Sequence, residues 1–163
     1  MSKPSTADAE LVLRLYEIRR DPELRRARQW LISEFKATSW EEIEAQYLTG
    51  SESDRYFRMV TSYWEMLAAM VNRGVLNEDL YFDTTGEHVV VWNKIKAIVP
   101  GARAKIRPTY LWNLEQLVRR HLAWRERSYA TAAEVIEAGS RLGTKGPKPP
   151  KAAKMKKLKK RAR

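Results

Sequence analysis

The sequence predicts an all-α protein, a single bundle of about seven helices around a buried central helix at about residues 52–73. Three observations indicate this class: apolar residues recur at helical spacing, capping residues precede these segments, and residues 52–73 are apolar on all but one face. The length of 163 residues suits one domain with an appendage. We expect a flexible N-terminus (1–6), a helical domain (7–143) and a disordered polybasic tail (144–163).

The first three helices are predicted from the residues that begin and end them. Thr6 can cap a helix that begins near Ala7. Asp21 and Pro22 occupy the N-cap and first helical positions of a second helix, which carries apolar residues as far as Phe35. The box "SWEE" at 39–42 opens a short helix that stops at Gly50.

The central helix has the most distinctive pattern. Ser51 can cap it and Gly74 can end it. Between them the polar residues form one narrow stripe, at Arg58, Ser62, Glu65 and Asn72. A helix with so little polar surface needs neighbours on its remaining sides, so we expect it to be the axis of the bundle.

The later segments are also expected to be helical. Asn77 can cap a short helix, followed by a turn that ends at Gly86. The segment "EHVVVWNKIKAIV" has β-branched residues typical of a strand, but its helical spacing and the lack of a partner strand favour a helix. A further helix is predicted from "RPTYLWNLEQLVRRHLAW", with its inward positions at Leu111, Leu114, Val118 and Leu122. The box "TAAE" at 131–134 predicts a separate last helix to Leu142, with Gly143 as its stop.

The positive charge is concentrated in the tail. The net charge is +11, and residues 144–163 carry ten basic residues and no acid, whereas residues 1–143 hold 21 basic residues against 20 acidic ones. The basic residues of the tail are Lys145, Lys148, Lys151, Lys154, Lys156, Lys157, Lys159, Lys160, Arg161 and Arg163. A near-neutral domain with a polycationic arm is thus predicted, rather than a domain with a basic recognition face.

The tail is predicted to bind nucleic acid or ribonucleoprotein without sequence specificity, because lysines contact phosphates as point charges. No aromatic residue follows Tyr129, so the tail has no platform for stacking bases. An anionic membrane surface is an alternative partner, with Met155 and Leu158 as its only good apolar anchors. A simple solubilising role is a further alternative.

The sequence offers little catalytic chemistry. It has no cysteine, two histidines far apart (His88 and His121), and glycines that occur singly. We therefore expect no cofactor and no metal site, and a protein that is not an enzyme. The lack of cysteine and of an apolar leader or membrane span suggests a cytoplasmic protein. The body is expected to bind a protein partner.

A few residues are candidates for a site in the body. Glu65 is a carboxylate in the most apolar helix, and it could be a perturbed acid in a cleft or, more simply, the partner of Arg58 or Arg103. Asp83 is expected to order a turn or cap the following helix. Trp92 and Trp112 are expected in or beside the core. The "RRDPELRRAR" cluster at 19–28 is expected to be a solvated face with salt bridges, with a nucleic-acid patch as the alternative.

The segments "LRLYEIRRDPELRRARQWL", "YFRMVTSYWEMLAAMVNRGVLNEDLYFD" and "WNKIKAIVPGAR" resemble, in this order, a family of small helical bacterial proteins classed as a domain of unknown function. The resemblance covers about residues 10–107, with Glu65, Gly74, Trp92 and Arg103 at recurring positions. It implies an all-α bacterial fold and no activity. Some relatives have a membrane helix before the domain, which is not found here, and the tail lies outside the pattern. The alternative function is an enzyme or toxin-like effector with Glu65 and Arg103 in a helical cleft.

Overall fold

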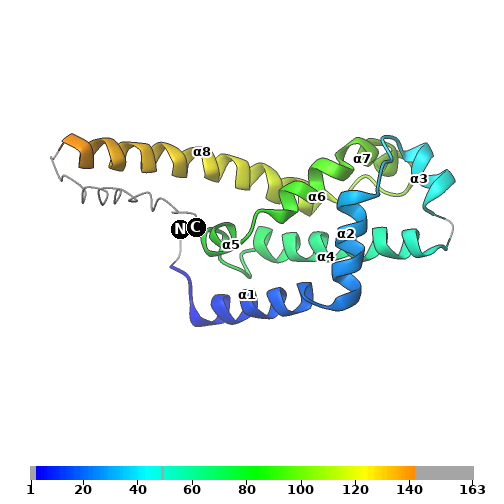
Figure 1. The fold of residues 1–163 in the computed structure, drawn as a ribbon, viewed down its shortest axis with the longest axis horizontal. Coiled ribbons are helices and arrows are strands. Elements are labelled where there is room, and N and C mark those ends of the chain that lie inside the picture. The colour runs from blue at the N-terminus through cyan, green and yellow to red at the C-terminus, as the bar shows by residue number, and fades with distance from the viewer. Residues whose placement is uncertain (1–2, 49, 142–163) are drawn as a thin grey trace, which may run out of the picture. The chain divides into compact units, whose positions relative to one another are not determined.

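The computed structural model describes residues 3–48 and 50–141, and these residues form helices and no strand, as the predicted fold class requires (Figure 1). The α-helices are α1 (Thr6–Arg19), α2 (Pro22–Ser33), α3 (Trp40–Gln46), α4 (Glu52–Asn72), α5 (Glu78–Thr84), α6 (Glu87–Ile95), α7 (Val99–Lys105) and α8 (Trp112–Arg141), with a 3₁₀ turn, η1 (Lys96–Ile98), between α6 and α7. The chain divides into two units, 1–125 and 126–163. The described part of the second unit is the continuation of α8.

The first helix begins one residue earlier than predicted. The N-cap is Ser5, not Thr6, because the Ser5 side chain accepts a hydrogen bond from the Asp8 N–H while Asp8 accepts one from the Ser5 N–H. The other oxygen of Asp8 accepts a hydrogen bond of 2.7 Å from the backbone N–H of Asn77. Asn77 is itself the predicted cap of α5, where its side chain accepts from the Leu80 N–H.

The central helix α4 matches its prediction closely. Ser51 caps it by accepting from the Asp54 N–H, and Gly74 follows it with a φ of +70°, a conformation that favours glycine. Its apolar faces are buried, whereas the polar stripe of Arg58, Ser62, Glu65 and Asn72 is exposed or half-buried. Helix α4 therefore forms the axis of the bundle in the first unit.

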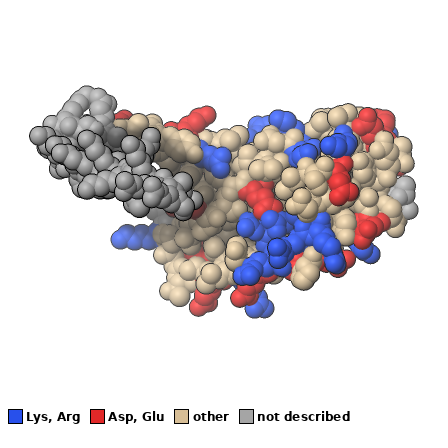
Figure 2. Space-filling view, viewed as in Figure 1, with Lys and Arg blue, Asp and Glu red and all other residues tan. Residues whose placement is uncertain are grey.

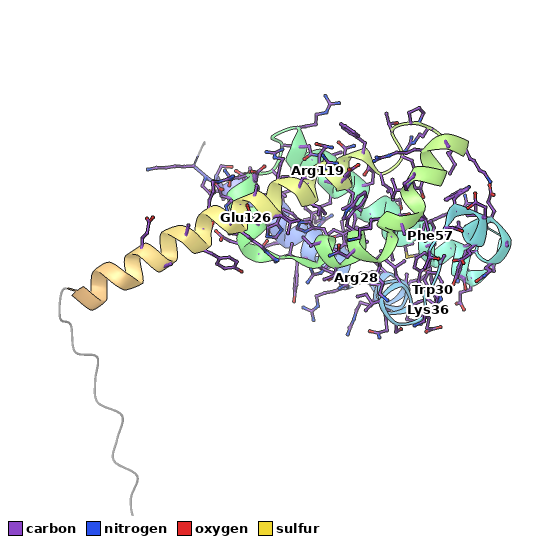
Figure 3. All side chains as sticks on the ribbon, turned by 90° about the horizontal axis from the view of Figure 1, so that it is seen from above. Arg28, Trp30, Lys36, Phe57, Arg119 and Glu126 are labelled. Atoms are coloured by element: carbon purple, nitrogen blue, oxygen red, sulfur yellow. The ribbon has the colours of Figure 1, made fainter. Side chains whose placement is uncertain are left out.

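Helix α2 crosses α4, and aromatic side chains fill the crossing (Figures 1 and 3). Phe35, just after α2, stacks on Phe57 of α4 with ring centroids 5.6 Å apart. Trp30 lies edge-on to Phe35 at 5.9 Å and to Tyr47 at 5.6 Å. Such large buried rings contribute much of the apolar area that stabilises a small bundle.

Residues 87–98 are helical, which confirms the choice of helix over strand, although the segment changes from α6 to the 3₁₀ turn η1 at Lys96. Helix α7 was not predicted, because Pro100 and Gly101 normally interrupt helices. Pro100 is tolerated in the first turn of α7, where its missing N–H is not needed. A Cβ atom at Gly101 would lie 2.3 Å from the Cβ of Trp40, so glycine allows α3 and α7 to approach this closely.

Helix α8 corrects two predictions. It begins at Trp112 rather than near Pro108, because Leu111 adopts a φ of +50° and separates a preceding turn from the helix. It also continues to Arg141, so "TAAE" at 131–134 lies inside a helix and opens no new one. Of its predicted inward positions, Leu111, Leu114 and Val118 are buried, whereas Leu122 is 44% exposed. The expected stop at Gly143 lies outside the described residues.

In the described segments, no helix has both the length and the apolar character needed to cross a membrane.

Candidate functional site

The predicted nucleic-acid-binding residues of the tail, Lys145 to Arg163, lie outside the described residues. The candidates in the body lie within the described residues, and the structure gives most of them surroundings that differ from those predicted by the sequence.

Glu65 caps another helix. Its Oε2 accepts a hydrogen bond of 2.8 Å from the Leu114 N–H, and its Oε1 accepts from the backbone and side-chain nitrogens of Asn113 at 3.0 and 2.9 Å. These N–H groups belong to the first turn of α8, which lacks intrahelical acceptors for them. Helix α4 thus supplies the cap of α8, whose N-terminal end carries the positive end of the helix dipole.

Arg103 does not pair with Glu65, contrary to the expectation from the sequence. It forms an ion pair of 2.7 Å with Glu115 of α8 and donates a hydrogen bond to the Tyr110 carbonyl. Burial opposes ionisation of Glu115, but the guanidinium groups of Arg103 and Arg119 outweigh it and keep the pKa of Glu115 below its ordinary value. Glu65 and Arg103 therefore both form contacts with residues at or just before the start of α8.

The other predicted positions are structural or exposed. Asp83 is exposed within α5 and does not cap α6, whose N-cap is Gly86 and has no side-chain cap. Trp92 is half-buried against the core, as expected. Trp112, which was expected in or beside the core, is 49% exposed, and the Arg103 guanidinium lies 5.8 Å from the centre of its ring.

The sequence did not predict that the two histidines are adjacent. His88 on α6 and His121 on α8 are almost fully buried, and His121 Nδ1 lies 2.8 Å from His88 Nε2. The chain of hydrogen bonds continues from His88 Nδ1 to the Tyr81 hydroxyl (3.1 Å) and from His121 Nε2 to Arg125 Nε (3.1 Å). We call these four residues, Tyr81, His88, His121 and Arg125, the histidine relay.

The donor and acceptor roles of the four side chains fix the direction of each hydrogen bond in the histidine relay. A guanidinium group can only donate, so Arg125 donates to His121 Nε2, which must be unprotonated. His121 then carries its proton on Nδ1 and donates to His88 Nε2, and His88 in turn donates from Nδ1 to the Tyr81 oxygen. The Tyr81 hydroxyl hydrogen remains as the donor at the end of the relay.

The surroundings keep both histidines neutral. Burial, with the charges of His121 and Arg125, lowers the pKa of His88 to about 3, and burial with Arg125 lowers the pKa of His121 to about 4. Phe82 stacks on His121 with a centroid distance of 4.4 Å. Burial also raises the pKa of Tyr81 well above its ordinary value. At neutral pH none of the three rings is charged.

Basic side chains gather over α2 and the end of α1, where Figure 2 shows a cluster of lysine or arginine groups. Tyr16 and four arginines line a hollow of about 370 Å³: Arg19, Arg20, Arg25 and Arg28. We call it the arginine hollow. Glu87 of α6 pairs with Arg28 through both carboxylate oxygens and with Arg19 at 3.4 Å.

The expectation of a salt-bridged face is therefore only partly met in this cluster. Arg20 and Arg25 are exposed and form no ion pair with any described carboxylate. With four guanidinium groups and one carboxylate, the arginine hollow is positive.

Beside the arginine hollow lies an apolar cavity of about 230 Å³ between α1, α4 and α5. Its walls include Leu15, Trp64, Leu67 and Tyr81, and it shares Tyr16 and Arg19 with the arginine hollow. The indole N–H of Trp64 is buried and has no hydrogen-bond acceptor. We call this apolar space the α1–α4–α5 cavity.

These features could not be derived from local sequence patterns. His88 and His121 are 33 residues apart, and each was recognisable only as a polar residue at an inward position of an apolar helix. The described residues include no group of three or more histidine, aspartate or glutamate side chains placed to hold a metal ion.

Comparison with known proteins gives one match. A family model described as a domain of unknown function, DUF4760, matches residues 4–121, which contain α1 to α7 and the start of α8. No curated protein and no solved structure matches the chain. The tail lies outside the matched residues.

Proposed function

The chain belongs to the DUF4760 family of domains of unknown function, and from its own residues we propose that it is a non-enzymatic helical interaction module with a nucleic-acid-binding tail. Residues 144–163 would bind nucleic acid or ribonucleoprotein nonspecifically, through phosphates. The separation of charge carries this proposal, since the tail holds ten basic residues and no acid, whereas residues 1–143 hold 21 basic and 20 acidic residues.

The ion pairs of the body also support the proposal that the tail, rather than the body, binds nucleic acid. The carboxylates of Glu87, Glu115 and Glu78 each pair with arginines of other elements. The body thus uses much of its positive charge internally, and the tail has no carboxylate of its own to neutralise it. Because lysine reads no base edges, the binding would tolerate changes of sequence. A chain without cysteine suits a reducing compartment, and we place this function in the bacterial cytoplasm.

The contacts of Glu65 and Arg103 favour this proposal over a helical enzyme. Both oxygens of Glu65 accept hydrogen bonds from the first turn of α8, and Arg103 is engaged by Glu115 and the Tyr110 carbonyl. Neither side chain is left to act on a substrate, so their roles are better explained by the stability of the fold.

The salt dependence of binding tests the proposal. In fluorescence anisotropy with a short DNA duplex, the logarithm of the affinity of the full chain should fall linearly with the logarithm of salt concentration, by about 0.9 per phosphate engaged. Replacing Lys156, Lys157, Lys159 and Lys160 with Gln should reduce this slope by about 3–4. The matched control replaces four lysines of the body with Gln: Lys3, Lys36, Lys94 and Lys96.

Two results would contradict the proposal. One is an equal loss of duplex binding in the control variant, and the other is binding that is insensitive to salt.

Replacing Met155 and Leu158 with Ser distinguishes nucleic-acid binding from membrane binding by the tail, because only attachment to anionic vesicles needs these apolar anchors. If vesicles bind more tightly than the duplex and this variant releases them, the tail is a membrane ligand instead.

A further inference from the structure

Two residues that line the α1–α4–α5 cavity, Trp64 and Tyr81, carry a buried polar hydrogen without an acceptor among the described residues. The Trp64 side chain is fully buried, and its indole N–H has no acceptor. Buried donors without a hydrogen-bond partner are rare. Trp64 is one of the residues that line the cavity, and its N–H is closed to solvent.

Tyr81 provides a second donor. The direction of the histidine relay makes the Tyr81 oxygen an acceptor from His88, so its own hydrogen needs another partner, and the described residues provide none. Arg19, Tyr63 and Glu87 act electrostatically on this hydroxyl. Arg19 and Tyr63 both line the cavity, and Arg19 also lines the arginine hollow. Tyr81 thus lines the same cavity as Arg19 and Tyr63.

The arginine hollow provides the charge. Arg28 and Arg19 share the single carboxylate of Glu87, while Arg20 and Arg25 have no carboxylate partner among the described residues. A carboxylate or phosphate group here would accept charge-assisted hydrogen bonds from guanidinium groups. Apolar walls with a few converging polar groups at one end are typical of small-molecule sites.

We infer that the α1–α4–α5 cavity and the arginine hollow together bind a small amphiphilic anion. Its hydrocarbon body occupies the cavity, and its carboxylate or phosphate head lies in the arginine hollow. At about 30 Å³ for each water-sized group, the cavity of about 230 Å³ holds roughly seven such groups. A chain of about eight carbons is therefore a suitable probe.

The full chain with ¹⁵N-labelled tryptophan tests this inference by NMR. Octanoate and octyl phosphate should move the indole resonance of Trp64 saturably, and the exposed Trp112 resonance serves as the internal control. A Trp64→Phe variant assigns the resonance. If octanoate binds more tightly than octyl phosphate, the site prefers a carboxylate head group, and the reverse order indicates a phosphate. Octan-1-ol, which has no charge, should bind about tenfold more weakly or worse, and inorganic phosphate should leave Trp64 unmoved.

Exposed arginines allow a matched pair of variants. The double variant Arg20→Glu/Arg25→Glu should weaken octanoate or octyl phosphate binding at least about tenfold and leave octanol binding unchanged. Arg26→Glu is the control, because Arg26 is on the same helix and does not line the arginine hollow, although it lines a neighbouring hollow with Pro22, Arg25 and Gln29. The inference is overturned if neither anion moves Trp64, if octanol binds as tightly as both anions, or if the double variant and the control behave alike.

Discussion

Glu65 on α4 and Leu114 on α8 are joined by a hydrogen bond of 2.8 Å between a carboxylate oxygen and a backbone N–H. The carboxylate therefore closes the open end of a helix that begins 47 residues after it. This contact explains how a charged residue can be retained in the most apolar helix of the chain. The same hydrogen bond joins α4 to the start of α8 within the first unit.

Replacing Glu65 should destabilise the fold without removing a catalytic group. Glu65→Ala removes the acceptor for three hydrogen bonds, and we expect the free energy of unfolding in urea to fall by about 1–3 kcal/mol. Glu65→Gln should lose less, because it keeps one carbonyl acceptor. Ser62→Ala, at an exposed position of the same stripe, should change the stability by less than about 0.5 kcal/mol. Equal stability of Glu65→Ala and the unmodified chain would show that the cap is unimportant.

The histidine relay should make the protein less stable in weak acid. Histidine has a pKa near 6.5 in the unfolded chain, whereas the fold lowers it to about 3 in His88 and about 4 in His121. As the pH falls below 6.5, only the unfolded chain takes up these protons, so stability decreases toward pH 4 and is unaffected above about 7. Below pH 6.5 the free energy of unfolding should decrease by up to about 1.4 kcal/mol per pH unit for each histidine.

Urea unfolding between pH 7 and 5 measures this effect, because the carboxylates titrate mainly at lower pH. Tyr81, Arg125 and the rings of Phe82, Trp64 and Trp124 face the two histidines, and within residues 3–48 and 50–141 no carboxylate contacts either ring. NMR of the folded protein should show both rings neutral at pH 5. Stability that is constant from pH 7 to 5 would be inconsistent with the relay as described.

Glu87 should be important for joining α2 to α6. Glu87→Gln leaves the part-buried guanidinium groups of Arg28 and Arg19 without their carboxylate, and we expect a loss of about 1–3 kcal/mol in thermal or urea unfolding. Glu34→Gln removes the same charge from an exposed position after α2 and should have little effect. If both variants unfold alike, the ion pair contributes nothing beyond its charge.

Gly101 should be intolerant of even a methyl group. In Gly101→Ala the new Cβ would lie 2.3 Å from the Cβ of Trp40, so α3 and α7 must separate, at a cost of about 1–3 kcal/mol. The helix propensity of alanine would oppose this by about 1 kcal/mol at most. Ala104→Ser, at an exposed position of α7, is the control for unfolding measurements. An unchanged or higher melting temperature for Gly101→Ala would contradict the close approach.

Local chemistry explains why many helices were predictable. Ser51, Asp21 and Asn77 accept hydrogen bonds from N–H groups two or three residues ahead, and such contacts depend only on neighbours in the chain. The same reasoning was wrong for "TAAE" at 131–134, because no glycine or proline between Trp112 and this box interrupts α8. A capping pattern predicts a helix start only where the preceding residues leave the helix.

The candidate site was predicted poorly because its contacts are tertiary. Glu65 was expected to pair with Arg58 or Arg103, but the actual partners of Glu65 and Arg103, Leu114 and Glu115, are identified only when α4, α7 and α8 are placed together. The pairing of His88 with His121 likewise depends on the packing of α6 against α8. Periodicity indicates which positions face inward, but it does not indicate which inward residues meet.

The two oxygens of Asp8 hold the beginnings of two helices at once, since one completes the capping box of α1 and the other accepts from Asn77 at the start of α5. A fluctuation that unwinds the first turn of α1 therefore also frees the cap residue of α5. These two turns should open as one cooperative unit, so their amide hydrogens would exchange with solvent at a common rate. The protons of Asn77 and Leu80 would then exchange faster when Asp8 is replaced, although 69 residues separate Asp8 from Asn77.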